Sequence, residues 1–446
     1  MNDWLDAESR VERALQLSEA QQWSEALREL EAAIAINPND PIWHAQRGQI
    51  LDQLENYDSA VEAYRQALDL DPEHLGIKTA LAIDMIRVGR YADAVEVLAE
   101  MEKIDPNYEP SFCHRVAAYT RMGLHDKAEE MFYLAQQINP DCPNCFHHMA
   151  ESLACRAEYS KAIFCWQRAL EIAPDYPQVR QRIAEAYRAQ KLYDKAREGY
   201  LAALRHDPGN TELLAELGDL LIEMDDLEGA AAKFQYLVEL DPQSVHGYAM
   251  LGLIAAQRDD LDRAVRYFES ALMLDEACPG LRAHMGEVEL RRGNYYDALH
   301  HLSLALEDQP DDCMARMAMG NCLLELGRPE EAARHFERMI ELDSGAVGAH
   351  HNLAVCYFLQ NDFEAGISHC HEALRLDPGN IMAIHKLALA YLHTCNWTKA
   401  RQMIQRGLAL QPDHAGLKAL PKTFIGLRFR QLGRRLIPSW LRGRQR

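Results

Sequence analysis

The 446-residue sequence has no run of about eighteen apolar residues, the length that a membrane-spanning helix requires. Its first residues, MNDWLDAESR, have neither the basic start nor the apolar core of a secretory signal. Basic residues are also scarce: 47 Lys and Arg stand against 68 Asp and Glu, so the formal net charge is −21. These absences argue against a membrane-spanning protein, a secreted protein and a non-specific nucleic-acid binder, which needs a basic surface.

The sequence also lacks the common catalytic motifs. It contains no P-loop, no glycine-rich dinucleotide fingerprint after a strand and no GxSxG nucleophile elbow, and HEALRLD at His371 differs from the HExxH of zinc proteases. The cysteine count, 11, is odd and the cysteines are scattered, which fits reduced thiols better than a disulfide framework. We therefore expect a cytoplasmic protein that is not an enzyme and needs no cofactor.

A period of 34 residues runs through the chain. Steps of 34 from Pro38 reach a proline at ten of twelve positions, Glu276 and Ser344 being the exceptions. Twelve residues before each of these positions stands an alanine, or Gly366 in one case, and a further twelve residues before that stands a second small residue, with Val116 as the large exception. Four residues after the alanine, a bulky residue recurs, as at Tyr64, Phe132, Trp166, Tyr200, Phe234, Phe268 and Phe336.

This pattern predicts two amphipathic helices in each 34-residue unit, with apolar residues at helical spacing. The small residues allow the paired helices to approach closely, and the bulky residue is expected to pack into the next unit. Proline at the unit boundary ends the second helix. One such helix pair cannot bury its apolar face alone, so the units must stack.

These residues resemble the tetratricopeptide repeat family, a 34-residue helix-turn-helix with small, aromatic and proline residues at fixed positions. The resemblance covers residues 7–414 as twelve repeats with boundaries near 40, 74, 108, 142, 176, 210, 244, 278, 312, 346 and 380, after a lead-in over 1–6 and before a tail over 415–446. It implies an all-α, right-handed superhelical solenoid. It also implies a non-enzymatic scaffold that binds a peptide segment of a partner protein in a concave groove lined by the first helix of each repeat.

The family's groove positions imply two contrasting sets of side chains. Repeats 5–7 supply a mainly acidic set, namely Glu151, Gln181, Glu185, Arg188, Glu212, Asp219 and Glu223. Repeats 8–12 supply an apolar and histidine-rich set, namely Leu253, Met317, Asn321, Leu324, His351, Val355, Phe358, His385, Leu389 and Leu392. Any single member can instead be a solvated charge or a core residue. Together they favour a basic, amphipathic peptide as the partner.

The tail, residues 415–446, contains nine Lys or Arg and no acidic residue. Three interpretations stay open. It can be a capping helix over the last repeat, or a segment that docks into the acidic groove of this chain or of a neighbour. It can also be an amphipathic anchor on anionic lipid, which would make the protein a membrane-peripheral assembly factor. The sequence leaves the oligomeric state and the identity of the partner open.

The stretch NPDCPNCFHH spans a repeat boundary and contains a CxxC pair. Cys142, Cys145 and His148, with His114 one repeat earlier, form a candidate zinc site, because CxxC has the spacing of half such a site. Cys113, Cys155 and Cys165 are further thiols nearby. A redox pair and an enzyme with a metal site near 142–148 are alternatives. The resemblance favours a structural joint without metal, since the family needs none.

Overall fold

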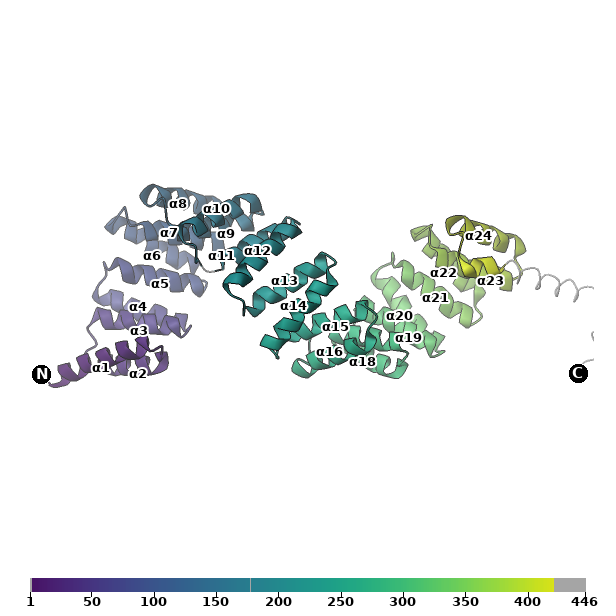
Figure 1. Cartoon of the computed structure of the whole chain (residues 1–446), viewed down its shortest axis with the longest axis horizontal. Coiled ribbons are helices and arrows are strands. Elements are labelled where there is room, and N and C mark those ends of the chain that lie inside the picture. Colours follow the sequence, from purple (N-terminus) through teal and green to yellow (C-terminus); the bar gives the residue numbers. More distant parts are fainter. Residues whose placement is uncertain (1, 177, 421–446) are drawn as a thin grey trace, which may run out of the picture. The chain divides into compact units, whose positions relative to one another are not determined.

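The computed structural model describes residues 2–176 and 178–420. In these residues the chain consists of helices joined by short turns and contains no strand (Figure 1). The predicted all-α fold of paired helices is therefore confirmed. Within the described ranges, no helix has both the length and the apolar character to cross a membrane. Most of the predicted basic tail, residues 421–446, lies outside these ranges, as does the first residue of the lead-in.

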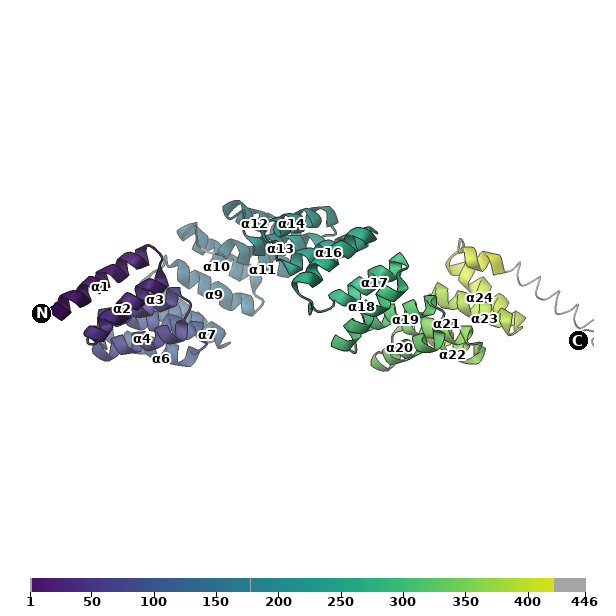
Figure 2. The ribbon, with the colours of Figure 1, turned by 90° about the horizontal axis from the view of Figure 1, so that it is seen from below.

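The chain divides into two compact units, Met1–Asp226 and Leu227–Arg446. The first unit contains α1 (Asn2–Glu19), α2 (Trp23–Ile36), α3 (Pro41–Gln53), α4 (Tyr57–Leu70), α5 (Leu75–Arg87), α6 (Tyr91–Ile104), α7 (Glu109–Arg121), α8 (His125–Ile138), α9 (Pro143–Cys155), α10 (Tyr159–Ile172), α11 (Val179–Ala189), α12 (Tyr193–His206) and α13 (Thr211–Glu223). Within this unit each helix packs on the next one along the chain, from α1 to α13 (Figure 2).

The second unit contains α14 (Leu227–Leu240), α15 (Val245–Gln257), α16 (Leu261–Leu274), α17 (Leu281–Arg292), α18 (Tyr295–Asp308), α19 (Cys313–Glu325), α20 (Pro329–Leu342), α21 (Val347–Leu359), α22 (Phe363–Leu376), α23 (Ile381–His393) and α24 (Trp397–Leu410). Here too, consecutive helices pack on one another, and the pairs α15–α16 and α21–α22 are in extensive contact.

Local signals in the sequence set the starts of several odd-numbered helices. Asp40, Asn210 and Asn380 precede α3, α13 and α23, and each side chain accepts a hydrogen bond from a backbone N–H in the first turn. In the turn before α23, the Asp377 carboxylate accepts a hydrogen bond from the backbone N–H of Gly379 at 3.0 Å. These side chains satisfy backbone N–H groups that a helix leaves without an internal partner.

The small residue that recurs every 34 positions lies in the core. Its alanines are 0% exposed, at positions Ala26, Ala60, Ala94, Ala128, Ala162, Ala196, Ala230, Ala264, Ala298, Ala332 and Ala400. The bulky residue four positions later contacts the other small residue of its own pair: Tyr64 packs on Gly48, and Phe336 packs on Gly320. The prediction that the bulky residue packs into the next unit is therefore incomplete, because its ring fills the space beside glycine within its own pair.

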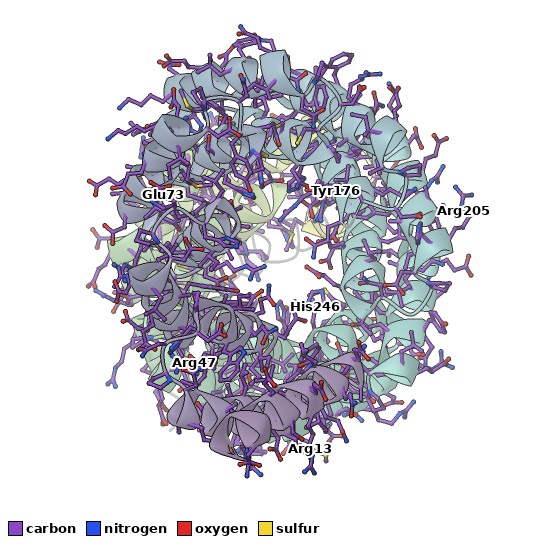
Figure 3. The ribbon with its side chains drawn as sticks, turned by 90° about the vertical axis from the view of Figure 1, so that its left-hand side faces the viewer. Arg13, Arg47, Glu73, Tyr176, Arg205 and His246 are labelled. Carbon is purple, nitrogen blue, oxygen red and sulfur yellow. The ribbon has the colours of Figure 1, made fainter. Side chains whose placement is uncertain are left out.

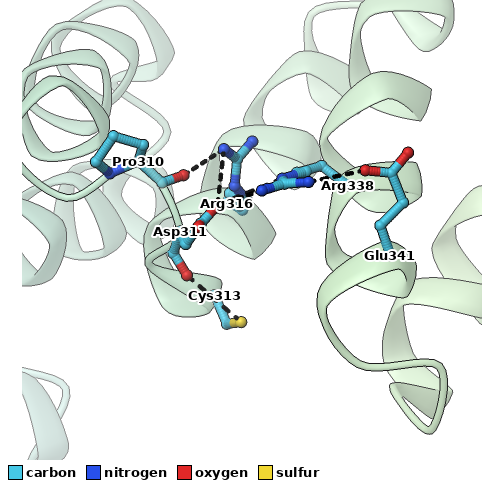
Figure 4. A network of polar contacts seen from close by, with 6 residues as sticks. All are labelled: Pro310, Asp311, Cys313, Arg316, Arg338 and Glu341. Atoms are coloured by element: carbon cyan, nitrogen blue, oxygen red, sulfur yellow. Dashed lines mark hydrogen bonds and ion pairs between the residues drawn. The ribbon is translucent and has the colours of Figure 1, made fainter.

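Charged side chains connect the turn before α19 to α20 (Figure 4). Arg338 of α20 donates hydrogen bonds to Asp311 and to Glu341, both at 3.0 Å. Arg316 of α19 donates to the carbonyl of Pro310 and lies 3.8 Å from the Asp311 carboxylate. The Arg338 and Asp311 side chains are 42% and 57% exposed. Such exposed ion pairs stabilise a protein by about 0–1 kcal/mol each.

Residues 415–420 are helical and close the described part of the chain. The backbone N–H of Leu417 donates to the His414 ring at 3.1 Å, so His414 caps this helix. Leu417 packs on Gly407 of α24, and both Leu417 and Leu420 are buried. This packing is what a capping helix requires. The other two interpretations of the tail depend on residues outside the described ranges.

Candidate functional site

One candidate site is a carboxylate-rich surface on α9, α11 and α13 of the first unit. We call it the acidic surface and define it by Glu151, Arg182, Glu185, Arg188, Glu212, Glu216 and Glu223. Glu212 and Glu223 are exposed and the other members are half-buried. Asp219, also predicted to lie here, is half-buried on α13.

Side-chain contacts join α11 to α13 across this surface. Arg188 donates two hydrogen bonds to one oxygen of Glu223, at 3.0 and 2.6 Å. The Gln181 amide donates to Glu216 Oε1 at 3.0 Å. Because these contacts cross between two odd-numbered helices, the predicted residues Gln181 and Arg188 of α11 face α13 on this surface.

Arg182 makes the corresponding connection between α11 and α9. It donates a hydrogen bond to Glu185 at 3.0 Å and lies 3.6 Å from Glu151. Neither Arg182 nor Glu216 was among the predicted groove residues. Each stands three residues before a predicted position, Glu185 or Asp219, and so shares its helix face, which is a signal that could have found them.

Carboxylates outnumber guanidinium groups on the acidic surface by five to two. Burial raises the pKa of Glu216, and the nearby Glu185 carboxylate raises it further. Burial also raises the pKa of Glu151, while Arg182 opposes this shift. The surface therefore holds carboxylates that an additional cation would stabilise in their charged form.

A different set of side chains lies on the odd-numbered helices of the second unit. Its half-buried members are Leu253, Met317, Asn321, Leu324, His351, Val355, Phe358, His385 and Leu389. Several of their apolar side chains pack partly against the core, as Met317 and Leu324 do, and Phe358 packs on Gly366. Leu392 is only 3% exposed. It is a core residue instead of a groove residue, because it packs within the cluster that contains Leu387 and Ile404.

Polar side chains connect α19 and α21 on this unit. The Asn352 amide donates to Asn321 Oδ1 at 2.8 Å and also contacts Met317 Sδ at 3.3 Å. Burial lowers the pKa of His351, and it lowers the pKa of His385, whose ring centroid lies 5.2 Å from that of His414. Both imidazoles are therefore mainly uncharged at neutral pH, so this set offers shallow apolar contacts and neutral hydrogen-bonding groups.

The predicted CxxC pair lies in a cluster of donor atoms between α7 and α9. We call it the thiol cluster and define it by Glu109, Cys113, Cys142 and Cys145, whose donor atoms all lie within 4.8 Å of one another. Cys113 Sγ and Cys142 Sγ are 4.0 Å apart. The Cys145 thiol donates to Glu109 Oε1 at 2.8 Å.

The thiol cluster differs from the predicted zinc ligands. Cys142 and Cys145 are in it, but neither His114 nor His148 is, although their ring centroids lie 6.2 Å from each other. Burial lowers the pKa of His114 to about 4 and that of His148 to about 3. Sequence reasoning missed Glu109 as a donor. Its spacing of four residues from Cys113, which places both on one face of α7, is a signal that could have revealed it.

Close contacts within the thiol cluster shift its pKa values. Burial raises the pKa of Glu109 to about 7. The contact with the Cys113 thiol lowers the pKa of Cys142. Of the three cysteines, Cys142 is therefore the one that loses its proton most readily.

Aromatic side chains mark the inner side of the first unit near the thiol cluster. Tyr176 donates to Asn144 Oδ1 at 2.8 Å, and its ring centroid lies 5.2 Å from that of His147. In Figure 3, Tyr176 lies on the inner side of this unit's helices, whereas Arg205 points outward. Asn144 lies between Cys142 and Cys145 in the sequence, so Tyr176 covers the start of α9 beside the cluster.

Comparison with known families identifies the repeats. Two family models described as tetratricopeptide repeat match the chain, one at residues 51–112 and 358–420 and the other at residues 11–74, 215–281, 285–347 and 323–381. The second model by itself covers more than half of the chain. No curated protein matches the sequence.

Several solved structures resemble the chain at low sequence identity. The APC/C hetero-tetramer Cut9-Hcn1 is 15% identical, with 92% of this chain and 95% of that chain covered and a TM-score of 0.47. YrrB, described as a TPR protein with an unusual peptide-binding site, is 22% identical, with coverage of 42% and 97% and a TM-score of 0.37. Yeast Tom70 is 17% identical, with coverage of 91% and 98% and a TM-score of 0.37.

Proposed function

Because the chain belongs to the tetratricopeptide repeat family, we propose that it is a protein-interaction scaffold that binds a basic segment of a partner protein on the acidic surface. The observation that carries this proposal is the excess of carboxylates on α9, α11 and α13, each the first helix of its repeat. The two arginines of this surface do not neutralise its five carboxylates, so its net charge is negative. Lysine or arginine side chains of a bound peptide would form ion pairs with the carboxylates that have no arginine partner.

The environment of these carboxylates supports a specific contact over a diffuse one. Arg188 and Arg182 already hold Glu223 and Glu185 in fixed positions. Glu212 has no such arginine partner among the described residues, and Glu216 is bonded only to the neutral Gln181 amide. Half-buried carboxylates attract a cation more strongly than fully solvated ones, since water screens them less. This argument applies to Glu216, which is half-buried, while Glu212 is exposed and is chosen because it has no arginine partner. Glu212 and Glu216 are the proposed contacts for the partner's cations.

We extend the proposal to the second unit, where the half-buried apolar side chains would contact apolar residues of the same or another partner. Met317, Leu324, Val355, Phe358 and Leu389 each leave part of their surface uncovered. This uncovered area is smaller than the sequence suggests, because Met317, Leu324, Phe358 and Leu389 also pack on the core. We therefore expect most of the affinity and the salt dependence to come from the first unit.

The test uses the full chain in affinity purification with mass spectrometry, followed by titration of each captured partner. A Glu212→Lys/Glu216→Lys variant is compared with Asp194→Lys/Glu198→Lys, which makes the same change of net charge at exposed carboxylates of α12. We expect the first variant to weaken binding by more than about tenfold, a loss of about 1.4 kcal/mol, and the second to leave it near wild type. Equal affinity of all three proteins for every partner would rule out the acidic surface as the binding site.

A further inference from the structure

We propose that Glu109, Cys113, Cys142 and Cys145 together bind one zinc ion, which links α7 to α9 and so ties two neighbouring helix pairs of the first unit. This site is independent of the proposed peptide-binding function. It uses two of the ligands that the CxxC motif suggested and replaces the two histidines by a third thiol and a carboxylate.

The separations of the donor atoms are those of a small tetrahedral site. A zinc–sulfur bond of about 2.3 Å in a tetrahedron places two sulfur ligands about 3.8 Å apart. Cys113 Sγ and Cys142 Sγ are 4.0 Å apart, and all four donor atoms lie within 4.8 Å of one another. The 2.8 Å hydrogen bond from Cys145 to Glu109 is shorter than two zinc ligands require, so these two atoms would separate by less than about 1 Å when metal replaces the thiol proton.

The backbone holds the ligands in place from two rigid helices. Glu109 and Cys113 are one turn apart on α7. Cys142 is the N-cap of α9, and its sulfur accepts the backbone N–H of Cys145 at 3.4 Å. Pro143 occupies the first turn of α9, where its fixed backbone angle favours the helix start. α7 and α9 pack directly on each other, so no rearrangement of helices is needed to bring the two ligand pairs together.

The residues that other repeats have at the positions of Glu109, Cys142 and Cys145 show which of these three core packing alone explains. At the position of Cys142, five other repeats have oxygen caps, namely Asp40, Asn210, Ser244, Asp312 and Asn380. Another repeat has Cys278 there, but Cys278 does not cap its helix, because the N-cap of α17 is Gly280. A neutral thiol is a weaker acceptor than these oxygens, whereas a thiolate on a metal accepts an N–H well. At the position of Glu109 no other repeat has an acidic residue. Cys145 alone is explained by core packing, since small or apolar residues such as Ala315 and Ala349 stand at its position.

The charge of the cluster also points to a cation. In the described part of the chain, no Lys, Arg or His forms an ion pair with Glu109, which accepts a hydrogen bond from the Cys145 thiol. All three cysteines are buried, at 6% exposure or less. Glu109 itself is half-buried beside them. Removing a carboxylate partly from water without a cationic partner is costly, and a divalent ion would offset that cost.

The types and the number of the donor atoms indicate which metal would bind and whether it would be structural or catalytic. Three thiolates with one carboxylate suit zinc, a borderline-soft ion with no redox chemistry of its own. Four protein ligands leave no position for water or substrate, so the ion would be structural. A disulfide between Cys113 and Cys142 is the competing use of these thiols. It would leave Glu109 without a partner for its charge.

The first test measures metal in the full chain purified without added metal. We expect about one zinc ion per chain by plasma mass spectrometry. After the metal is removed under reducing conditions, Co²⁺ titration should give the strong visible absorption of tetrahedral cobalt bound to several thiolates. Protein that contains no equimolar metal and gives no such cobalt spectrum, or that is recovered with a Cys113–Cys142 disulfide under reducing purification, would overturn the proposal.

The second test identifies the ligands. Cys113→Ser and Glu109→Gln should each weaken Co²⁺ and Zn²⁺ binding by more than about tenfold. Mutating a residue that only hydrogen-bonds to a metal ligand already costs about this much affinity, so losing a ligand should cost at least as much. Cys165→Ser is the matched control, because Cys165 is a buried thiol in α10 outside the cluster. His148→Gln should also bind metal as wild type does. Loss of binding in His148→Gln with normal binding in Glu109→Gln would overturn the assigned ligands, and Glu109→Gln keeps the test decisive if Cys113→Ser does not fold.

Discussion

The ring of Phe268 in α16 packs directly against the bare backbone of Gly252 in α15, where any Cβ would overlap the ring. Phe268 is 0% exposed. The same contact joins Tyr64 to Gly48 and Phe336 to Gly320. Each of these pairs consists of a small residue and a bulky residue sixteen positions later, so the repeat encodes the close approach of its own two helices.

A methyl group at Gly252 should destabilise the second unit. Gly252→Ala adds a Cβ that meets the rigid Phe268 ring, and overpacking of this kind costs about 1–3 kcal/mol. Another repeat shows a combination that accommodates alanine, since Leu98 occupies the bulky position opposite Ala82. We therefore expect Phe268→Leu to restore part of the stability of Gly252→Ala.

The measurement is urea unfolding of the four proteins of this double-mutant cycle. A coupling free energy above about 0.5 kcal/mol is expected, because the two residues touch. Gly209→Ala is the control, since a Cβ there meets no atom within 4 Å. Strict additivity of the Gly252 and Phe268 changes would contradict the packing relationship.

Asp84 should make the first unit less stable as the pH rises. Its side chain in α5 is 2% exposed, Arg87 donates to its Oδ1 at 3.1 Å, and its Oδ2 has no hydrogen-bond partner. Burial, helped by the nearby Asp52 carboxylate, raises the pKa of Asp84 from 3.8 to about 7. Between these two pKa values the folded chain retains a proton that the unfolded chain has released, so the free energy of unfolding decreases as pH rises through this window and levels off above pH about 7.

Asp84→Asn removes this dependence, because the amide carries no charge at any pH. The variant should unfold at about the wild-type temperature near pH 4 and at a higher temperature at pH 8, with a gain of at least about 1 kcal/mol. Thermal unfolding followed by circular dichroism at the two pH values measures it. A variant that is less stable than wild type at pH 8 would show that the contact with Arg87 outweighs the cost of burial.

Replacing Arg115 by alanine should lower the free energy of unfolding more than replacing Arg338 does. The Arg115 side chain is 7% exposed, donates to Glu102 at 2.8 Å and to the Ser111 carbonyl at 3.1 Å, and lies over the Phe112 ring. Its loss in Arg115→Ala should cost on the order of 2 kcal/mol, since the charged hydrogen bonds and the packing disappear together.

Arg338→Ala is the matched comparison, because Arg338 also makes two ionic contacts but is 42% exposed. Its loss should cost less than about 1 kcal/mol, and 0.5 M salt should reduce the effect further. Denaturant unfolding of both variants checks the difference. Equal losses would mean that burial does not control the strength of these ion pairs.

Removal of zinc should weaken the first unit if the thiol cluster binds it. An ion that binds the folded chain adds stability in proportion to the logarithm of its concentration over its dissociation constant. Dialysis against a chelator should therefore lower the unfolding temperature of wild type, and added zinc should restore it. Cys142→Ser should unfold at the same temperature with and without chelator, while a chelator effect that persists in this variant would place the metal elsewhere.

The all-helical fold follows from the sequence alone. The period of 34, the buried alanines such as Ala60 and Ala264 and the capping residues such as Asp40 act over short distances along the chain, so they set where helices form and which faces are apolar. The acidic character of α9, α11 and α13 is also visible in the sequence, because groove positions recur at a fixed place in each repeat.

Only the tertiary structure decided which side chains meet. It placed Glu109 among three thiols and left His114 and His148 out of that group, it added Arg182 and Glu216 to the acidic surface, and it placed Leu392 in the core. The reason is that contacts between neighbouring helices depend on their rotation and offset. A small change in the rotation or the offset of a helix changes which atoms touch. The packing of many side chains together determines the rotation and the offset, and the repeat position of a single residue does not specify them.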